Sequence, residues 1–298
     1  MAFDQLLGTA AKLNASTEAL AALAAYLRID TEGLDAHPAV SSLLKGIVQA
    51  LGGDELLGDV TPEQRKMASA TIRAFFLQAA ELVDNPARAP GWSYADAVVL
   101  QSQGQASSMW PMLVEKCLGR MSGLDAALAR EGCAFLDVGT GVAKLAIAAC
   151  QKWPKMRVVG VDPWEPSITL ARRNVAAAGL ENRVDLRLAG IETLREEGVF
   201  DLAWIPGPFL PKDVLPSAID VTLRALKPGG WAILGLYAGP DDPLASKLVE
   251  LRVVRSGGYV MVPDDAAWAL KQHGFSDVSV LPREWQAPML FVVGRKAP

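Results

Sequence analysis

A glycine turn between two short apolar segments constrains this chain more than any other feature of its sequence. Residues 135–138 form an apolar run typical of a buried parallel strand, and Gly139 and Gly141 follow it directly. Glycine permits a tight turn and lets a ligand approach the main chain closely. An apolar stretch then predicts a helix, and residues 157–161 predict a second strand that leads into Asp162. The pattern predicts a strand–turn–helix–strand unit of the nucleotide-binding type.

Two carboxylates indicate which ligand this turn would take. Asp162 follows the turn by about 20 residues, the offset expected of an acid that binds ribose hydroxyls. Asp137 precedes the first glycine by two residues, where its charge would oppose a phosphate. A carboxylate at that place favours a cationic or amino-bearing ligand over the pyrophosphate of a dinucleotide.

Composition and charge argue against several classes of protein. Hydrophobic residues make up 51% of the 298 residues, so a sizeable core is available. The net charge of −4 argues against nucleic acid as a partner, since unspecific binding needs a basic field. We expect no membrane span and no signal peptide. The three cysteines, Cys117, Cys133 and Cys150, show no metal-binding pattern and are predicted to be buried thiols of a cytoplasmic protein.

The hydrophobic periodicity changes near residue 130. Residues 1–130 predict helices, among them one with breaks near Asn14 and Ser16 and one that starts at Thr61. Strands and helices then alternate, which is typical of a parallel α/β sheet. Strands are expected over 135–138, 157–161, 183–188, 200–205, 231–236, 278–283 and 289–295, with a tight turn over 227–230. We expect a helical domain over 1–130 and an α/β domain over 131–298.

The chain resembles the class I S-adenosylmethionine-dependent methyltransferases over roughly residues 130–298. The resemblance rests on Asp137-x-Gly139-x-Gly141, on Asp162, and on two later features. These are the L-K-P-G-G sequence at 226–230 and the Gly-Phe at 274–275 before a two-strand ending. The resemblance implies S-adenosylmethionine as cofactor and a Rossmann-like sheet of seven strands, with the last strand inserted antiparallel between the fifth and sixth. One departure is Ala143, where the family often has a third glycine.

The resemblance also implies a set of cofactor-binding residues. Asp137 would orient the amino-acid end, Asp162 the ribose, and Trp164 either lies on the adenine or packs on a helix. Ile191 stands where the family often has an acid that binds the adenine amino group, and Glu192 follows it. The expected cofactor residues are Asp137, Gly139, Thr140, Gly141, Asp162, Pro163, Trp164, Ile191, Glu192 and Trp204.

The acceptor side is less defined. Trp110, Pro206 and Phe209 are expected to form an apolar wall beside the acceptor, with core packing as the alternative for each. Trp92 and Tyr94 are further wall candidates on the same terms. The polar segment 101–110 either runs over the cofactor site or is a linker. Many small-molecule members of the family carry a helical N-terminal domain that covers the acceptor pocket and pairs two subunits, so a homodimer is expected.

Methyl transfer from a sulfonium is an in-line displacement that needs alignment and exclusion of water. It requires no metal, and the two histidines, His37 and His273, stand far apart. No catalytic residue is assigned, so the acceptor is acidic or its base lies in the N-terminal domain. The leading interpretation is O-methylation of a small, partly apolar or aromatic molecule. The alternatives are a non-catalytic S-adenosylmethionine-binding or dimeric interaction protein, and an RNA or protein methyltransferase.

Overall fold

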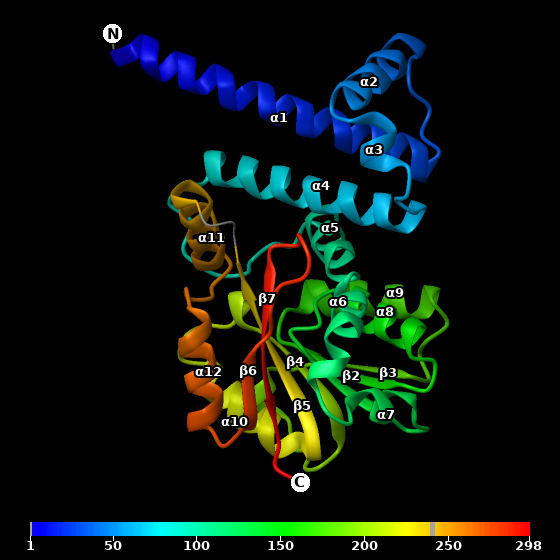
Figure 1. Ribbon diagram of the computed structural model, residues 1–298, viewed down its shortest axis with the longest axis vertical. Coiled ribbons are helices and arrows are strands. Elements are labelled where there is room, and N and C mark those ends of the chain that lie inside the picture. Colours follow the sequence, from blue (N-terminus) through cyan, green and yellow to red (C-terminus); the bar gives the residue numbers. More distant parts are fainter. Residues whose placement is uncertain (1, 239–241) are drawn as a thin grey trace. The chain divides into compact units, whose positions relative to one another are not determined.

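The computed structural model describes residues 2–238 and 242–298, and the chain divides into two compact units, Met1–Pro86 and Ala87–Pro298. The first unit is helical throughout (Figure 1). Its helices are α1 (Ala2–Glu32), α2 (Pro38–Ala50), α3 (Gly53–Leu57) and α4 (Pro62–Asp84). This division lies earlier in the chain than the boundary expected at residue 130, because the next helices pack beside the sheet. The domain boundary at 130 stays a prediction.

The first helix is longer than the sequence predicts. Polar residues bond to the helix itself instead of ending it: Ser16 Oγ donates to Lys12 O at 3.4 Å, and Thr17 Oγ1 donates to Leu13 O at 2.9 Å. The expected breaks near Asn14 and Ser16 are therefore wrong. The predicted start of α4 is confirmed, since Thr61 and Gln64 form a capping box.

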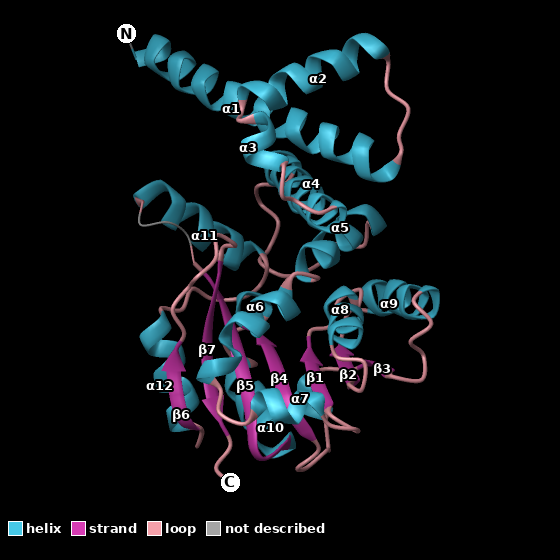
Figure 2. Ribbon diagram, turned by 45° about the vertical axis from the view of Figure 1, so that its right-hand side comes forward, coloured by secondary structure: helices cyan, strands magenta, loops and turns pink. Residues whose placement is uncertain are grey.

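The second unit is built on a seven-stranded sheet in the order β3-β2-β1-β4-β5-β7-β6 (Figure 2). The strands β1 to β5 run parallel, and β7 is antiparallel to both β5 and β6. The predicted methyltransferase-type sheet is thus confirmed. The strands are β1 (Ala134–Val138), β2 (Arg157–Asp162), β3 (Val184–Leu188), β4 (Phe200–Pro206), β5 (Leu226–Tyr237), β6 (Ser276–Val280) and β7 (Met289–Arg295).

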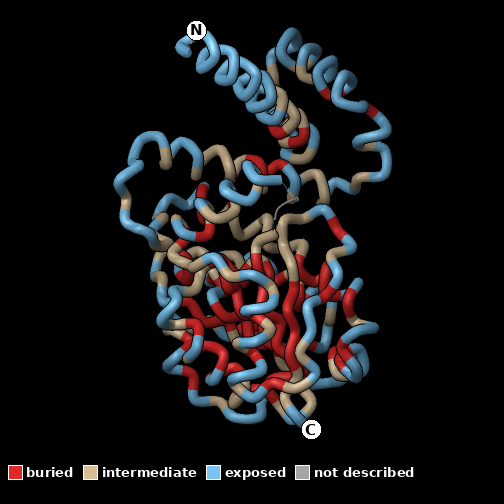
Figure 3. The backbone as a smooth tube through the Cα atoms, turned by 60° about the vertical axis from the view of Figure 1, so that its left-hand side comes forward, coloured by how far each residue is buried: buried red, intermediate tan, exposed pale blue. Residues whose placement is uncertain are grey.

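Helices cover both faces of this sheet, and the buried residues concentrate along its strands (Figure 3). Neighbouring strand residues alternate between two apolar clusters: Phe135 belongs to the first and Leu136 to the second. Side chains of α6 to α9 join the first cluster, and those of α10 and α12 join the second. The helices are α5 (Ala97–Ser107), α6 (Trp110–Cys117), α7 (Leu124–Ala129), α8 (Lys144–Lys152), α9 (Glu165–Ala177), α10 (Leu215–Ala225), α11 (Pro243–Arg255) and α12 (Pro263–Gln272).

The L-K-P-G-G sequence is part of β5, which corrects the turn predicted over 227–230. Leu226 pairs with Phe200, and an irregularity in register precedes the pairing of Trp231 with Leu202. Lys227 Nζ donates to the buried Asp201 carboxylate at 2.7 Å. Pro228 can stand in β5 because the hydrogen-bond pairing with β4 is already interrupted at this place.

Within the described part of the chain, no helix combines the length and the apolar character that a membrane span requires.

Candidate functional site

The turn after β1 has the left-handed backbone that its glycines predict. Gly139 has φ 63° and Gly141 has φ 57°. A Cβ on Gly139 would also stand 3.1 Å from Pro206 Cγ, so the tip of β4 lies directly beside the turn. Ala143, in place of the family's third glycine, is fully buried and has φ 62°, a conformation that is unfavourable for alanine.

Asp162 holds this turn from the end of β2. Its Oδ2 accepts from Gly141 N at 2.9 Å, and its Oδ1 accepts from Trp164 N at 2.8 Å. Burial raises the pKa of the Asp162 carboxyl, and the two backbone hydrogen bonds oppose that rise. Each carboxylate oxygen has a second lone pair, so the group can still accept from a ligand hydroxyl.

Asp137 is the most deeply buried carboxylate of the site, with 1% of its surface exposed. Its Oδ2 accepts a hydrogen bond from Thr140 Oγ1 at 2.7 Å. Burial raises the pKa of Asp137 to about 7, and the nearby Asp162 adds to the rise while Thr140 opposes it. Gly160 on β2 makes room for this pair, because a Cβ there would stand 2.7 Å from Thr140 Oγ1. A bound cation would stabilise the ionised form.

Polar residues that the sequence did not single out support the turn from outside. Asn174 Nδ2 donates to Val142 O at 2.8 Å and also bonds to the Gln101 side-chain amide at 3.1 Å. A Cβ on Gly104 would collide with Val142 Cγ2, so α5 lies tightly against the turn. The polar segment 101–110 therefore runs beside the predicted cofactor turn. Asn174 has no motif spacing by which the sequence could have identified it.

The residues after β2 and β3 differ in exposure. Trp164 is half-buried and Pro163 is exposed, and the Trp164 Nε1 donates to Tyr94 O at 2.7 Å. Ile191 is 3% exposed and packs in the second apolar cluster. Glu192 is exposed, and its carboxylate folds back against Gly190. Contacts of these residues with a cofactor stay predictions.

Trp110 and Trp204 pack inside the first apolar cluster. Trp110 is 1% exposed and stacks on Phe135 at a centroid distance of 4.9 Å. Trp204 is 5% exposed and lies edge-on to Trp110 and to Phe291, at 5.8 Å from each. Both indoles are core residues in this structure, and contacts of Trp110 with the acceptor and of Trp204 with the cofactor stay predictions.

Four aromatic side chains gather beyond the tips of β4 and β5, and we call them the aromatic cluster: Trp92, Tyr94, Phe209 and Tyr237. The Phe209 ring lies 5.2 Å from Trp92 and 6.1 Å from Tyr237, edge-on to both. Trp92 lies 5.1 Å from Tyr94. Phe209 follows Pro206, which borders the glycine turn, so the aromatic cluster lies next to the predicted methyl donor.

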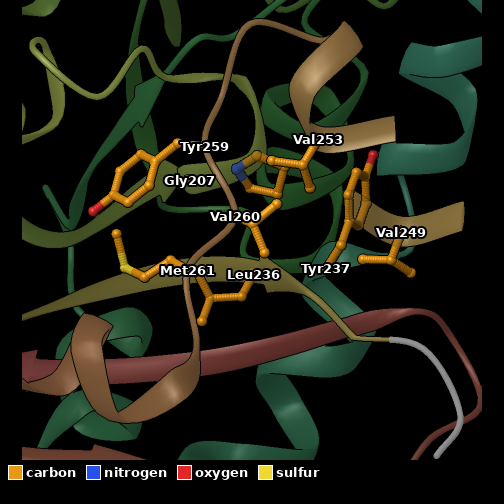
Figure 4. Close-up of a pocket in the computed structure, with 9 residues that line it drawn as sticks. Gly207, Leu236, Tyr237, Val249, Val253, Tyr259, Val260 and Met261 are labelled. Atoms are coloured by element: carbon orange, nitrogen blue, oxygen red, sulfur yellow. The ribbon is translucent and has the colours of Figure 1, made fainter. Parts of the chain in front are cut away.

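A small apolar pocket of about 20 Å³ adjoins this cluster (Figure 4). Tyr237 and Tyr259 border it from opposite sides, with Val253 and Val260 between them. Burial raises the pKa of Tyr237, while Arg252 and a hydrogen bond with the Gln103 side chain oppose the rise. Tyr237 therefore stays a neutral phenol at physiological pH. The sequence did not predict this residue, which has no local motif around it.

Side chains elsewhere offer little metal chemistry. Between residues 2 and 238 and from 242 onward, no group of three or more His, Cys, Asp or Glu side chains could hold a metal ion. His37 caps α2, and His273 Nδ1 contacts Asp220 Oδ1 at 2.5 Å. All three cysteines are buried and unpaired, as predicted, and burial raises the pKa of Cys133 to about 12. Thiols of this kind are not nucleophiles.

Comparison with known families identifies the domain that holds the turn. Residues 135–230 match the family described as "Methyltransferase domain". Ribosomal protein L11 methyltransferase of Sorangium cellulosum is 31% identical over 118 residues, which cover 39% of this chain and 35% of that protein. The chain spans 35% to 57% of the length of the first three curated relatives that it matches.

Solved structures resemble the whole chain at low identity. An O-methyltransferase family protein from Burkholderia thailandensis is 15% identical, with a TM-score of 0.65 over 100% of this chain and 98% of that one. Human N-acetylserotonin methyltransferase, solved in complex with S-adenosylmethionine, is 16% identical, with a TM-score of 0.65 over 99% of this chain and 98% of that one. At this identity the likeness shows a shared fold.

Proposed function

We propose that this chain, which belongs to the class I S-adenosylmethionine-dependent methyltransferases, methylates an oxygen of a small, partly apolar or aromatic molecule. The observation that carries the proposal is the position of the aromatic cluster. It lies at the tip of β4, where Pro206 borders the turn that joins Asp137 to Asp162. A donor site and an apolar acceptor wall thus share one edge of the sheet, as ligand sites of parallel α/β sheets do.

The residues of the turn fit S-adenosylmethionine. Its amino group would meet the buried Asp137, its ribose hydroxyls would meet Asp162, and the glycines leave the backbone open between them. The bound cofactor supplies a methyl group that is already activated by a positive sulfur. Asp137 is buried, paired only with Thr140 among the bonds described, and has a pKa near neutrality, which suits a cationic ligand.

The chain's own task is then alignment and exclusion of water. Trp92, Phe209 and Tyr237 offer edges and faces against which a flat acceptor can pack. No general base lies in the aromatic cluster, so we propose that the acceptor hydroxyl is acidic, as in a phenol, an enol or a carboxylic acid. Tyr237 can donate a hydrogen bond to such an oxygen, because its own pKa is raised.

We also propose that two copies pair through the N-terminal helices and that the enzyme works in the cytoplasm. Several large apolar side chains of α1 and α2 are more than half exposed, among them Phe3 (68%), Leu6 (63%) and Leu43 (70%). Such patches commonly mark protein interfaces. Sedimentation velocity should show a dimer that Leu43→Glu weakens, and a monomeric wild-type protein would contradict the pairing.

Calorimetry with S-adenosylhomocysteine tests the donor site. Asp162→Ala should weaken binding by about tenfold or more, the value expected for a charged hydrogen bond. Asp185→Ala is the matched control, since Asp185 lies on β3 with a side chain that is 57% exposed. Equal affinities of the two variants would refute the ribose assignment.

Turnover of methyl-labelled cofactor against matched phenols, amines and carboxylic acids tests the reaction itself. We expect label in phenols or acids, and Phe209→Ala should lower kcat/KM by about tenfold through lost packing. Binding without turnover of any acceptor would favour a non-catalytic binding protein. Transfer only to protein or RNA would favour the methyltransferases of macromolecules, a class that includes the L11 relative.

A further inference from the structure

Residues 87–96, which we call the strap, run without helix or strand from the acceptor side of the site to its cofactor side. On the acceptor side the Trp92 ring lies edge-on to Phe209 at 5.2 Å. On the cofactor side Tyr94 O accepts a hydrogen bond from Trp164 Nε1 at 2.7 Å. The strap therefore contacts both the segment after Asp162 and the tip of β4.

The strap is folded around one arginine. The Arg88 guanidinium donates to Gly91 O at 2.7 Å and to Ser93 Oγ at 3.1 Å, and its Cζ lies 5.2 Å from the Tyr94 ring centroid. Arg255 O, at the end of α11, accepts from both Arg88 Nη2 and Gly91 N. Because these bonds join most of its length, the strap is held together as one piece.

Trp164 links this piece to the glycine turn. Its backbone N donates to Asp162 Oδ1, while the other oxygen of Asp162 accepts from Gly141 N. A continuous series of hydrogen bonds thus runs from Gly141 through Asp162 and Trp164 to Tyr94 of the strap. A contact that restricts the Asp162 carboxylate therefore also restricts Trp164, the residue that bonds to the strap.

We propose that Trp164 is a positioning residue that couples cofactor binding at Asp162 to the order of the strap. The cofactor's identity in this inference rests on the proposed function. A ligand on Asp162 restricts Trp164 and so favours the strap conformation in which Tyr94 O accepts from Trp164 Nε1. We call this conformation the closed strap, and it carries Trp92 and Tyr94 of the aromatic cluster. Coupling between two sites is reciprocal, so the closed strap strengthens cofactor binding by the same factor. The bound cofactor therefore raises the fraction of molecules whose acceptor wall is complete, and the acceptor binds preferentially second.

Hydrogen exchange of the strap amides tests this coupling without knowledge of the acceptor. Saturating S-adenosylhomocysteine should slow exchange of the wild-type strap by about fivefold at the Gly91 amide, which donates to Arg255 O, the ratio expected for one neutral hydrogen bond. Trp164→Phe keeps an aromatic ring and removes the N–H donor, so strap protection on ligand binding should disappear. Trp268→Phe, at an α12 position that is 63% exposed, is the matched control and should keep the protection.

The outcomes separate the coupling from the proposed function. Ligand binding to the wild-type protein without slower exchange in the strap would overturn the coupling alone. Full protection in Trp164→Phe would overturn it as well. Absence of S-adenosylhomocysteine binding to the wild-type protein would overturn the coupling and the proposed function together. The wild-type measurement decides the question even if the variant folds poorly.

Discussion

Replacing Asp137 by asparagine should stabilise the ligand-free protein at neutral pH while it removes affinity for the cofactor. The buried carboxyl has a pKa of about 7, against about 3.9 for an unperturbed aspartate. A difference of about three pH units corresponds to about 4 kcal/mol, since each unit is worth about 1.4 kcal/mol. Asparagine carries no charge into the core and keeps an oxygen that can accept from Thr140 Oγ1.

The sign of the pH dependence follows from the raised pKa. The native state keeps this proton to a higher pH than the unfolded chain does. The stabilisation is therefore complete below about pH 4 and is lost as the pH rises toward about 7. The asparagine side chain of the variant does not titrate, so the stability difference in favour of the variant should grow across this window. It should approach its largest value, at most about 4 kcal/mol, above about pH 7.

Tryptophan fluorescence during urea unfolding is a suitable assay. All eight tryptophans lie between residues 92 and 285, so the signal reports the second unit. The free energies of unfolding of the wild-type protein and of Asp137→Asn should agree within about 1 kcal/mol near pH 4 and diverge at higher pH. A difference that does not change with pH would refute the assignment of the raised pKa. Calorimetry should show that the wild-type affinity for S-adenosylhomocysteine falls by up to about tenfold per unit below pH 7.

Three further substitutions test packing in the second unit, each by the free energy of urea unfolding. Ala143→Gly should add about 1 kcal/mol, because glycine adopts the left-handed backbone at φ 62° without strain, and a loss would contradict this. Gly235→Ala should cost about 1–3 kcal/mol, because its Cβ would collide with Trp204, and a neutral effect would show that the indole can move. Asp201→Asn should cost about 3 kcal/mol, because Arg130 and Lys227 would lose their ionised partner, a carboxylate that is 3% exposed. An unchanged midpoint of urea unfolding would mean that these ion pairs contribute nothing to stability.

The sheet could be predicted because its signals are local. The strands β1, β2 and β4 are short and largely apolar, β3 alternates apolar with charged residues, and all four are bounded by turn residues that the sequence shows directly. Predictions failed where tertiary pairing overrides local preference. The Pro-Gly-Gly of 228–230 indicates a turn, and Gly229 does have φ 78°, yet Gly230 O accepts from Lys296 N, so bonding to the segment after β7 makes this stretch part of β5. The ends of β6 were misplaced for a similar reason, since pairing with β7 defines them.

The donor and acceptor sides of the site differ in how far apart their residues stand in the sequence. Asp137 and Asp162 belong to one βαβ unit, so spacing alone brings them together. The aromatic cluster draws on the strap, on the segment after β4 and on the end of β5, and no spacing rule relates Trp92 to Tyr237. This separation has a consequence for specificity. Changes in the strap can reshape the acceptor wall without moving the two carboxylates, provided that Tyr94 O still accepts from Trp164. A strap variant such as Trp92→Ala should therefore change acceptor preference, while cofactor affinity falls by no more than the coupling of about fivefold.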